Sequence, residues 1–222
     1  MKVSFLTDIV TPYGVAVLEA LGRRCDLTVL FASESGTRGL AWHFDGGLPF
    51  RHELIGGLTV RRSSPDATDF YLSPRVVAAL RRARPDAIIS GGYSFPSLYA
   101  AAYAQTARVP LLIHSDGTHD SEAHLRPEQR IARRVVTRLA WGAVGNSEPA
   151  SRRLVEIGFR PERVFRALHA TRLEPFWRVA ERRNALRAGP MRLLAVGRLI
   201  PRKGVDLLLR AVARTFNRGT VQ

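Results

Sequence analysis

The chain has 222 residues, of which 45% are hydrophobic and 24% charged, an ordinary composition for a globular protein with a buried core. A single cysteine, Cys25, excludes an internal disulfide bond and suits a reducing compartment. The amino-terminal apolar run is interrupted by Asp8 and does not resemble a signal peptide. The uncharged stretch 87–107 contains glycine, proline and hydroxyl residues that argue against a membrane span. We therefore expect a cytoplasmic protein.

The net charge of +15 is unevenly distributed along the chain. Residues 1–123 carry equal numbers of acidic and basic side chains, so the whole excess lies in residues 124–222. This asymmetry favours an anionic partner, such as lipid headgroups at the inner face of a membrane, a phosphorylated substrate or nucleic acid. A solvated basic surface without a partner is the alternative. The arginines of two expected helices would form the patch: Arg130, Arg133, Arg134, Arg138, Arg152 and Arg153.

Short apolar runs alternate with longer helical patterns from the first residue to about residue 170. The expected strands are 2–7, 26–32, 58–62, 86–90, 109–114, 142–147 and 163–168. The expected helices are 12–21, 73–83, 95–107, 127–140 and 147–158, with Thr11, Ser73 and Ser147 as amino-terminal caps. This alternation predicts an α/β fold, a Rossmann-like doubly wound parallel sheet that binds ligands at the carboxyl ends of its strands.

The alternation of strand and helix patterns ends after the expected sheet. Residues 169–190 are polar, carry five arginines and end in Gly189-Pro190, a domain-boundary signal. We expect a Rossmann-like domain over 1–170, an interdomain linker over 171–190, and the first strand (191–197) and helix (205–213) of a second Rossmann-like domain over 191–222. A complete domain needs on the order of 50 residues or more, so the second domain is expected to be truncated.

The second region opens with the sequence GRLIPRKG, residues 197–204. Gly197 and Gly204 permit tight turns, and Arg198 offers a planar guanidinium that suits phosphate oxygens. Lys203 stands at the start of a helix, where free backbone N–H groups favour an anion. The pattern predicts a site for a diphosphate, with a simple strand-to-helix turn as the alternative.

The stretch GRLIPRKGVDLLLRA resembles the signature that opens the carboxyl-terminal domain of retaining GT-B glycosyltransferases of family 4. VGNSEPASRRLVEIGFRPERV (144–164) resembles the end of that family's amino-terminal domain, and LLIHSDGTHDSE (111–122) stands where members carry an active-site loop. The resemblance implies transfer of a sugar from a nucleotide diphosphate sugar to an acceptor hydroxyl. Arg198 and Lys203 would clamp the donor diphosphate without a metal or other cofactor, and the sequence has no Asp-x-Asp triplet.

Within this resemblance, His114 and Asp116 are the candidate catalytic-loop residues, and Tyr13, Gly14, Gly92 and Tyr93 belong to loops on the acceptor side. The acceptor would be a sugar, a lipid-linked molecule or another small molecule. Three features depart from the family pattern: the first loop has only Gly14, the hinge begins with His169, and no E-x7-E segment is present. We therefore expect the 222-residue chain alone to show little or no transferase activity.

Three other functions are compatible with parts of the sequence. The loop 114–124 gathers three histidines, two aspartates and a glutamate, ligand types for a metal-dependent hydrolase, although no standard ligand spacing appears. Ser94 follows a strand in a Gly-x-Ser pattern and could act with Asp116 and His119 in a serine hydrolase. A non-catalytic basic module would bind anionic lipid or nucleic acid, with lipid favoured because no nucleic-acid reading element is evident.

Overall fold

The computed structural model describes residues 1–33, 47–60, 70–123, 125–183, 193–197 and 199–216. These residues fall into two compact units, with the division after Arg172. Each unit is described by itself. The first unit contains the sheet and its helices, and the second contains the helices α6 (Glu174–Arg183) and α7 (Val205–Phe216).

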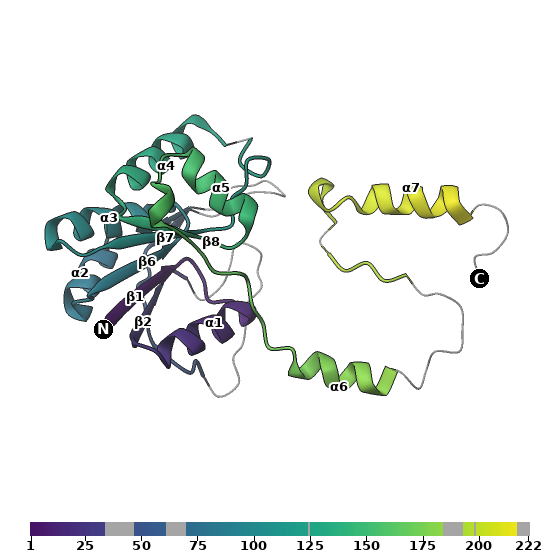
Figure 1. The fold of residues 1–222 in the computed structure, drawn as a ribbon, viewed down its shortest axis with the longest axis horizontal. Helices are drawn as coiled ribbons and strands as arrows, with labels where there is room; N and C mark the ends of the chain where they lie inside the picture. The colour runs from purple at the N-terminus through teal and green to yellow at the C-terminus, as the bar shows by residue number, and fades with distance from the viewer. Residues whose placement is uncertain (34–46, 61–69, 124, 184–192, 198, 217–222) are drawn as a thin grey trace. The chain divides into compact units, whose positions relative to one another are not determined.

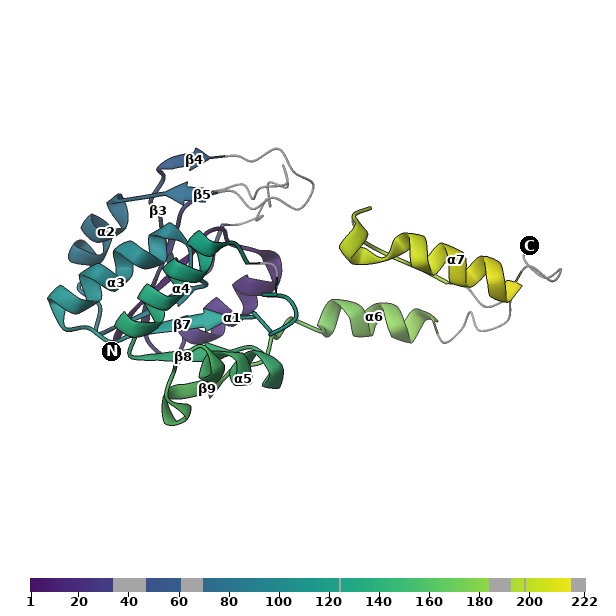
Figure 2. The ribbon, with the colours of Figure 1, turned by 90° about the horizontal axis from the view of Figure 1, so that it is seen from above.

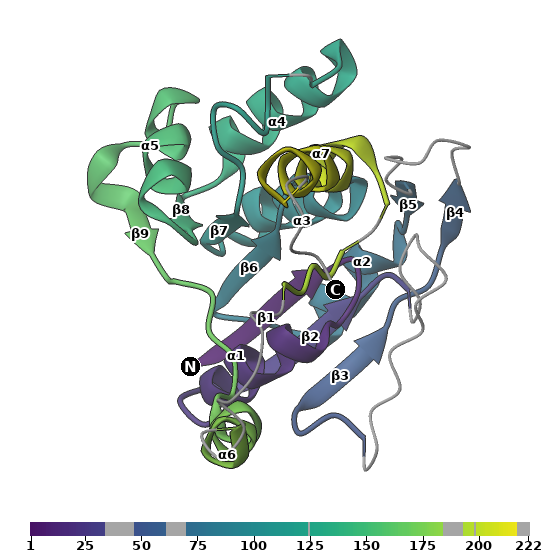
Figure 3. The ribbon, with the colours of Figure 1, turned by 90° about the vertical axis from the view of Figure 1, so that its right-hand side faces the viewer.

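The first unit is built on a seven-stranded parallel sheet with the order β3-β2-β1-β6-β7-β8-β9. Its strands are β1 (Lys2–Thr7), β2 (Asp26–Phe31), β3 (Arg51–Leu54), β6 (Ala87–Gly91), β7 (Leu111–Ser115), β8 (Gly142–Gly145) and β9 (Val164–Arg166). Figure 3 shows this order across the sheet. The chain builds outward from β1 to β3 and then returns to place β6 on the other side of β1, so the topological switch point lies between β1 and β6. The predicted Rossmann-like doubly wound fold is confirmed.

Helices cover both faces of the sheet (Figure 1). On one side lie α2 (Arg75–Ala83), α3 (Phe95–Ala107), α4 (Pro127–Leu139) and α5 (Glu148–Glu156), and on the other lies α1 (Pro12–Gly22). The apolar side chains of the strands form two cores, one on each face of the sheet, because successive side chains of a strand point to opposite faces. Val3 and Val29 pack with Leu18 of α1, whereas Leu6 and Ile88 pack with the larger cluster under α2 to α5.

The helix caps follow from the sequence with one exception. The side chains of Thr11 and Ser147 accept hydrogen bonds from the backbone N–H groups of Gly14 and Ala150, as expected of amino-terminal caps. Ser73 was also expected to cap a helix, but α2 begins at Arg75 after Pro74, and the buried Ser73 hydroxyl has no partner among the described residues.

The segment around residue 58 was expected as a strand of the main sheet, and this prediction was wrong. β4 (Leu58–Val60) pairs antiparallel with β5 (Phe70–Leu72) in a separate two-stranded sheet. Figure 2 shows these two strands side by side, apart from the seven parallel strands. The place at the edge of the main sheet is taken by β3, Arg51–Leu54, which is not among the expected strands.

The second unit differs from the expected strand and helix. α7 confirms the predicted helix, and α6 forms within the segment expected to be a linker. The described residues Leu193 to Gly197 form no strand, because a β-strand needs a neighbouring strand to pair with and none is present in the described part of this unit. Residues 191 and 192 lie outside the described residues.

Candidate functional site

The carboxyl ends of β1, β6, β7 and β9 bring together polar and aromatic residues from distant parts of the sequence. Asp8 follows β1, Gly92 follows β6, and His114 is the next-to-last residue of β7. Backbone hydrogen bonds fix these ends to one another: the Gly92 N–H donates to the His114 carbonyl at 2.8 Å, and the Ala32 N–H donates to the Asp8 carbonyl at 3.1 Å. In an open α/β sheet, ligands bind at this edge beside the switch point. We name Asp8, Tyr13, Gly92, His114 and His169 the carboxyl-edge site.

His114, a predicted catalytic-loop residue, lies half-buried at the centre of this site. Its ring centroid is 6.3 Å from that of Phe5 and 6.3 Å from that of His169. Burial lowers the pKa of His114, the nearby His169 lowers it further, and the charge of Asp116 acts in the opposite direction. His114 is therefore a neutral imidazole near pH 7, able to accept or donate one hydrogen bond at each ring nitrogen. Asp116, the second predicted catalytic-loop residue, is exposed beside it.

Tyr13 and Gly14, predicted for the acceptor side, lie at the start of α1. The Tyr13 side chain is exposed, at 55% for the residue, and its ring stands at 84° to the His169 ring with centroids 6.1 Å apart. Gly14 belongs to the helix cap, since its N–H donates to the Thr11 hydroxyl at 3.2 Å and a Cβ would lie 3.0 Å from that oxygen. The ring of His169 thus contacts the rings of both Tyr13 and His114.

Asp8 is a candidate functional residue that the sequence analysis missed. Burial raises the pKa of the Asp8 carboxyl to about 6, and a hydrogen bond with the Ser94 side chain offsets only part of this effect. Its Oδ1 atom has no hydrogen-bond partner among the described residues. A half-buried carboxyl group with one buried, unpaired oxygen at the switch point of such a sheet is typical of a functional site. The signal in the sequence was an aspartate directly after an apolar strand.

Gly92 and Tyr93 share a predicted loop but face different surroundings. Gly92 has φ +86°, and no atom lies within 4 Å of the place that a Cβ would occupy, so its backbone is accessible at the carboxyl edge. The Tyr93 ring instead packs beside the larger core cluster with the Arg133 guanidinium 4.5 Å from its centroid. Burial raises the pKa of Tyr93 to about 12. The side chain of Tyr93 therefore supports the helices, whereas Gly92 remains with the site.

A buried ion cluster holds the loop that follows β7. The Glu122 side chain, only 4% exposed, binds the Arg133 guanidinium of α4 through Oε1 and the Arg153 Nε of α5 through Oε2 at 3.0 Å. Arg153 also binds Glu156 at 2.9 Å. Gly117 passes directly over this carboxylate, since a Cβ on Gly117 would overlap Glu122 Oε1. We name Glu122, Arg133, Arg153 and Glu156 the Glu122 cluster, and it fixes the loop that carries Asp116.

The geometry argues against both hydrolase alternatives. His119 Nδ1 lies 3.6 Å from Glu156 Oε2, so this histidine faces α5, whereas His114 faces His169. His124 lies outside the described residues. Among the residues that the structure describes, no three histidine, cysteine or carboxylate side chains gather as a metal-ligand group. The alternative triad of Ser94, Asp116 and His119 stays a hypothesis, and the contact of His119 with Glu156 does not support it.

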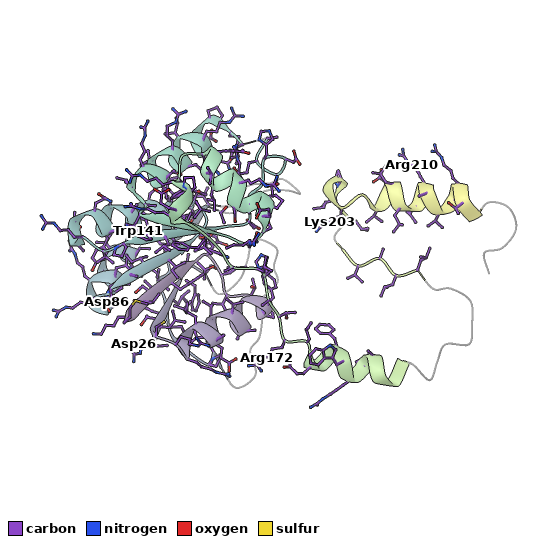
Figure 4. The ribbon with its side chains drawn as sticks, in the orientation of Figure 1. Asp26, Asp86, Trp141, Arg172, Lys203 and Arg210 are labelled. Carbon is purple, nitrogen blue, oxygen red and sulfur yellow. The ribbon has the colours of Figure 1, made fainter. Side chains whose placement is uncertain are left out.

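The predicted diphosphate-binding turn is partly described. Pro201–Lys203 form a short 3-10 turn, and Gly204 adopts φ +62°, a left-handed conformation that favours glycine. The Leu208 N–H donates to the Gly204 carbonyl at 3.0 Å, so Lys203 lies just before the first turn of α7. A Cβ on Gly197 would lie 4.0 Å from Lys203 Cγ, which places these two residues together. Arg198 lies outside the described residues, and Figure 4 labels Lys203.

The strand order defines a Rossmann-like unit of the GT-B type. The chain belongs to Glycosyltransferase Family 4, whose family model matches residues 13–167. That match covers the strands from β2 to β9 and three of the five residues of the carboxyl-edge site, Tyr13, Gly92 and His114. Asp8 lies before it and His169 after it. A comparison with curated protein sequences gave no significant match.

Solved structures share this fold at low sequence identity. HepE from Anabaena, crystallised in complex with UDP-glucose, has a TM-score of 0.66 at 19% identity, over 96% of this chain and 57% of that chain. MurG from Acinetobacter baumannii has a TM-score of 0.53 at 15% identity, over 96% and 57%. The UDP-N-acetylglucosamine 2-epimerase from Rickettsia bellii has 0.51 at 16%, over 84% and 48%. The chain thus spans little more than half of the HepE and MurG chains. Because an epimerase shares the fold, the fold by itself does not select a reaction.

Proposed function

We propose that this chain supplies the acceptor-binding side of a retaining glycosyltransferase that moves a hexose from a nucleotide diphosphate sugar to an acceptor hydroxyl. The observation that carries the proposal is the carboxyl-edge site, in which Asp8, Gly92 and His114 meet beside the switch point of a family 4 domain. HepE, of similar fold, has been crystallised with UDP-glucose, which makes a nucleotide sugar the first donor class to test.

The roles of individual residues follow from their chemistry. His114, neutral near pH 7, would orient the acceptor hydroxyl or a sugar hydroxyl by hydrogen bonding, with Asp116 beside it. Lys203, with Arg198, would stabilise the negative charge that develops on the departing diphosphate, a task that needs positioned cations and no metal. Gly197 and Gly204 would let the backbone turn close to the phosphates.

A fusion protein tests transfer, because the chain spans only part of its structural relatives. We would join residues 1–190 to the remaining part of Anabaena HepE and supply UDP-glucose with a panel of saccharide acceptors. The expected result is a glucoside product with the anomeric configuration of the donor, detected by mass spectrometry and NMR. The 222-residue chain alone is the baseline, for which we expect no turnover. A fusion that folds and binds UDP-glucose but glucosylates no acceptor, or inverts the anomer, would contradict the proposal.

A second candidate function is contact with an anionic membrane, favoured by the outward surface of α4. Arg130, Arg134 and Arg138 are exposed there beside Ile131, at 62% exposure, and Val135, at 41%. Basic and apolar side chains on one helix surface suit the headgroup region of a bilayer. Two arginines of the predicted patch do not contribute, because Arg133 and Arg153 turn inward to Glu122.

Vesicle flotation tests this second candidate. No helix in the described part of the chain is long and apolar enough to cross a bilayer, so any membrane contact of these residues would be peripheral. We expect the chain to float with vesicles containing phosphatidylglycerol at low salt and to be released at high salt. The Ile131→Ser/Val135→Ser double variant should reduce flotation. Equal flotation with neutral phosphatidylcholine vesicles would contradict an anionic partner.

A further inference from the structure

We propose that His169, in the segment that leads out of the sheet, forms with Tyr13 and His114 a stacking surface for a saccharide ring, and that this surface is the acceptor subsite. The inference rests on the proposed function and deepens it, since it names a neutral saccharide as the acceptor class. His169 was noted in the sequence only as a departure in the hinge, and the family match ends at residue 167.

The segment 167–172 is held against the first unit at three points. The Ala167 N–H donates to the Gly145 carbonyl at 3.0 Å, which ends the pairing of β9 with β8. The His169 ring then lies between the rings of Tyr13 and His114, and the Arg172 guanidinium binds the Glu19 carboxylate of α1. Figure 4 shows Arg172 where the chain leaves this unit. The segment thus belongs to the first unit as far as Arg172, and His169 has a fixed place beside the site.

Two exposed rings, those of Tyr13 and His169, and the half-buried ring of His114 lie next to one another at the carboxyl edge. The His169 ring is perpendicular to both neighbours, at 84° to Tyr13 and 90° to His114. Tyr13 has this perpendicular contact with His169 alone among the described ring pairs, and both side chains are exposed, so a saccharide ring can reach them. The negative face of such a ring attracts the polarised C–H groups on the apolar face of a pyranose.

Polar groups for the saccharide hydroxyls lie at the same edge. The His114 nitrogens, the bare backbone of Gly92 and the Asp8–Ser94 pair stand at the ends of neighbouring strands. A few polar groups beside apolar or aromatic surface are the usual composition of a small-ligand site. Because a carboxylate accepts hydrogen bonds and repels anions, the chemistry of this edge favours a neutral saccharide over a sugar phosphate.

Saturation-transfer NMR on the full 222-residue chain tests the inference, with maltose, cellobiose and lactose as probes and glucose 6-phosphate for comparison. We expect a signal from at least one neutral disaccharide, reduced at least about threefold in His169→Ala and in Tyr13→Ala, the size of a lost aromatic contact. His169→Phe should retain the signal because it keeps the ring, whereas His169→Gln should not. Melting temperatures establish that each variant is folded.

A second exposed aromatic pair provides the matched control. Trp141 and Phe165, exposed at 43% and 46%, stack with their ring centroids 6.3 Å apart. Figure 4 shows Trp141 on the side of the sheet where Asp86 and Asp26 mark the amino ends of strands. Phe165→Ala should leave the saccharide signal unchanged. The inference is overturned by an absent signal in the wild type, by full binding in His169→Ala, by an equal loss in Phe165→Ala, or by preference for glucose 6-phosphate. A fusion that transfers glucose despite such a result would leave the proposed function standing.

Discussion

Two regions of the first unit each shield a carboxyl group from solvent, but they differ in how fully that carboxyl group is paired. In the Glu122 cluster, both carboxylate oxygens bind an arginine, and the loop backbone packs closely over them. In the carboxyl-edge site, Asp8 has one hydroxyl partner, its Oδ1 atom is unpaired among the described residues, and its pKa is raised to about 6 by burial. Breaking the first arrangement should cost stability, whereas neutralising the second should increase it.

We propose that this difference in pairing separates the structural carboxyl group of Glu122 from the functional one of Asp8. A buried charge that is fully paired fixes the elements around it, and here it joins the loop after β7 to α4 and α5. A buried charge that is poorly paired is retained against its cost in stability, which is expected where a ligand completes its hydrogen bonds. Four predictions test the comparison, from the largest expected effect to the smallest.

Glu122→Gln should produce the largest loss of stability. The substitution keeps the shape of the side chain but leaves Arg133, which is largely buried, without its counter-ion and Arg153 with Glu156 alone. Removing one partner of a buried pair lowers the free energy of unfolding by about 3 kcal/mol or more, which urea denaturation would measure. Glu128→Gln in α4 is the control, since Glu128 is exposed and pairs only with Arg126 in the salt bridges of the described residues. Similar losses in both variants would contradict the structural role of the cluster.

Asp8→Asn should stabilise the fold above pH 6. The folded-state pKa of about 6 lies above the ordinary value of 3.8, so ionisation is harder in the folded protein. The contribution of Asp8 to stability is therefore greatest below pH 4, falls as the pH rises through the interval from about 4 to 6, and stays lower above it. Removing the charge should raise the free energy of unfolding at pH 8 by about 2 kcal/mol and abolish the fall between pH 4 and 6. Destabilisation at pH 8 would show that Asp8 is paired as fully as Glu122.

Gly117→Ala should weaken the same cluster through the backbone. The new Cβ overlaps Glu122 Oε1, and two arginines prevent the carboxylate from moving aside. We expect a loss of about 2 kcal/mol in the free energy of unfolding, the usual size of an overpacking effect. Combined with Glu122→Gln, the loss should be less than the sum of the two single losses, because the sites are in contact. Strict additivity would show that Gly117 and Glu122 act separately.

His169→Ala should raise the pKa of His114, the smallest of the four effects. His169 contributes to the lowering of that pKa, although burial contributes more. The shift can be followed in the imidazole C–H resonances during an NMR titration. Because the folded-state pKa of His114 lies below its ordinary value, its contribution to stability is complete above pH 6.5 and is lost as the pH falls. If the pKa of His114 is unchanged in His169→Ala, His169 does not affect the electrostatics of the carboxyl-edge site.

Most of the fold could be predicted because alternating apolar strands and amphipathic helices carry a strong periodic signal. β3 was not predicted because Arg51–Leu54 is short and largely polar, as an edge strand can be. Leu58–Val60 was assigned to the wrong sheet, because strand propensity does not say which partner a strand takes, and its partner Phe70–Leu72 follows across an intervening loop.

The site was predictable in its loops but not in its side-chain directions. His114 and Tyr13 were expected there because the sequence resembles family 4, and the His114 loop also because it follows the carboxyl end of a strand. Tyr93 follows a strand in the same way, yet its ring turns to Arg133, a contact that depends on how α4 packs. His169 is far in sequence from Tyr13 and His114, and only the path of the chain after β9 brings these three rings together.

The most direct test of the central claim maps bound saccharide onto the backbone amides of the isotope-labelled chain by NMR. The account predicts that a neutral disaccharide shifts the amide resonances of residues 8–14, 91–94, 114–117 and 168–170, which surround the carboxyl-edge site. Resonances of the Glu122 cluster in α4 and α5, and of Trp141 and Phe165, should stay unchanged. Shifts centred on Trp141 and Phe165, or on α4, would place the saccharide elsewhere and contradict the account.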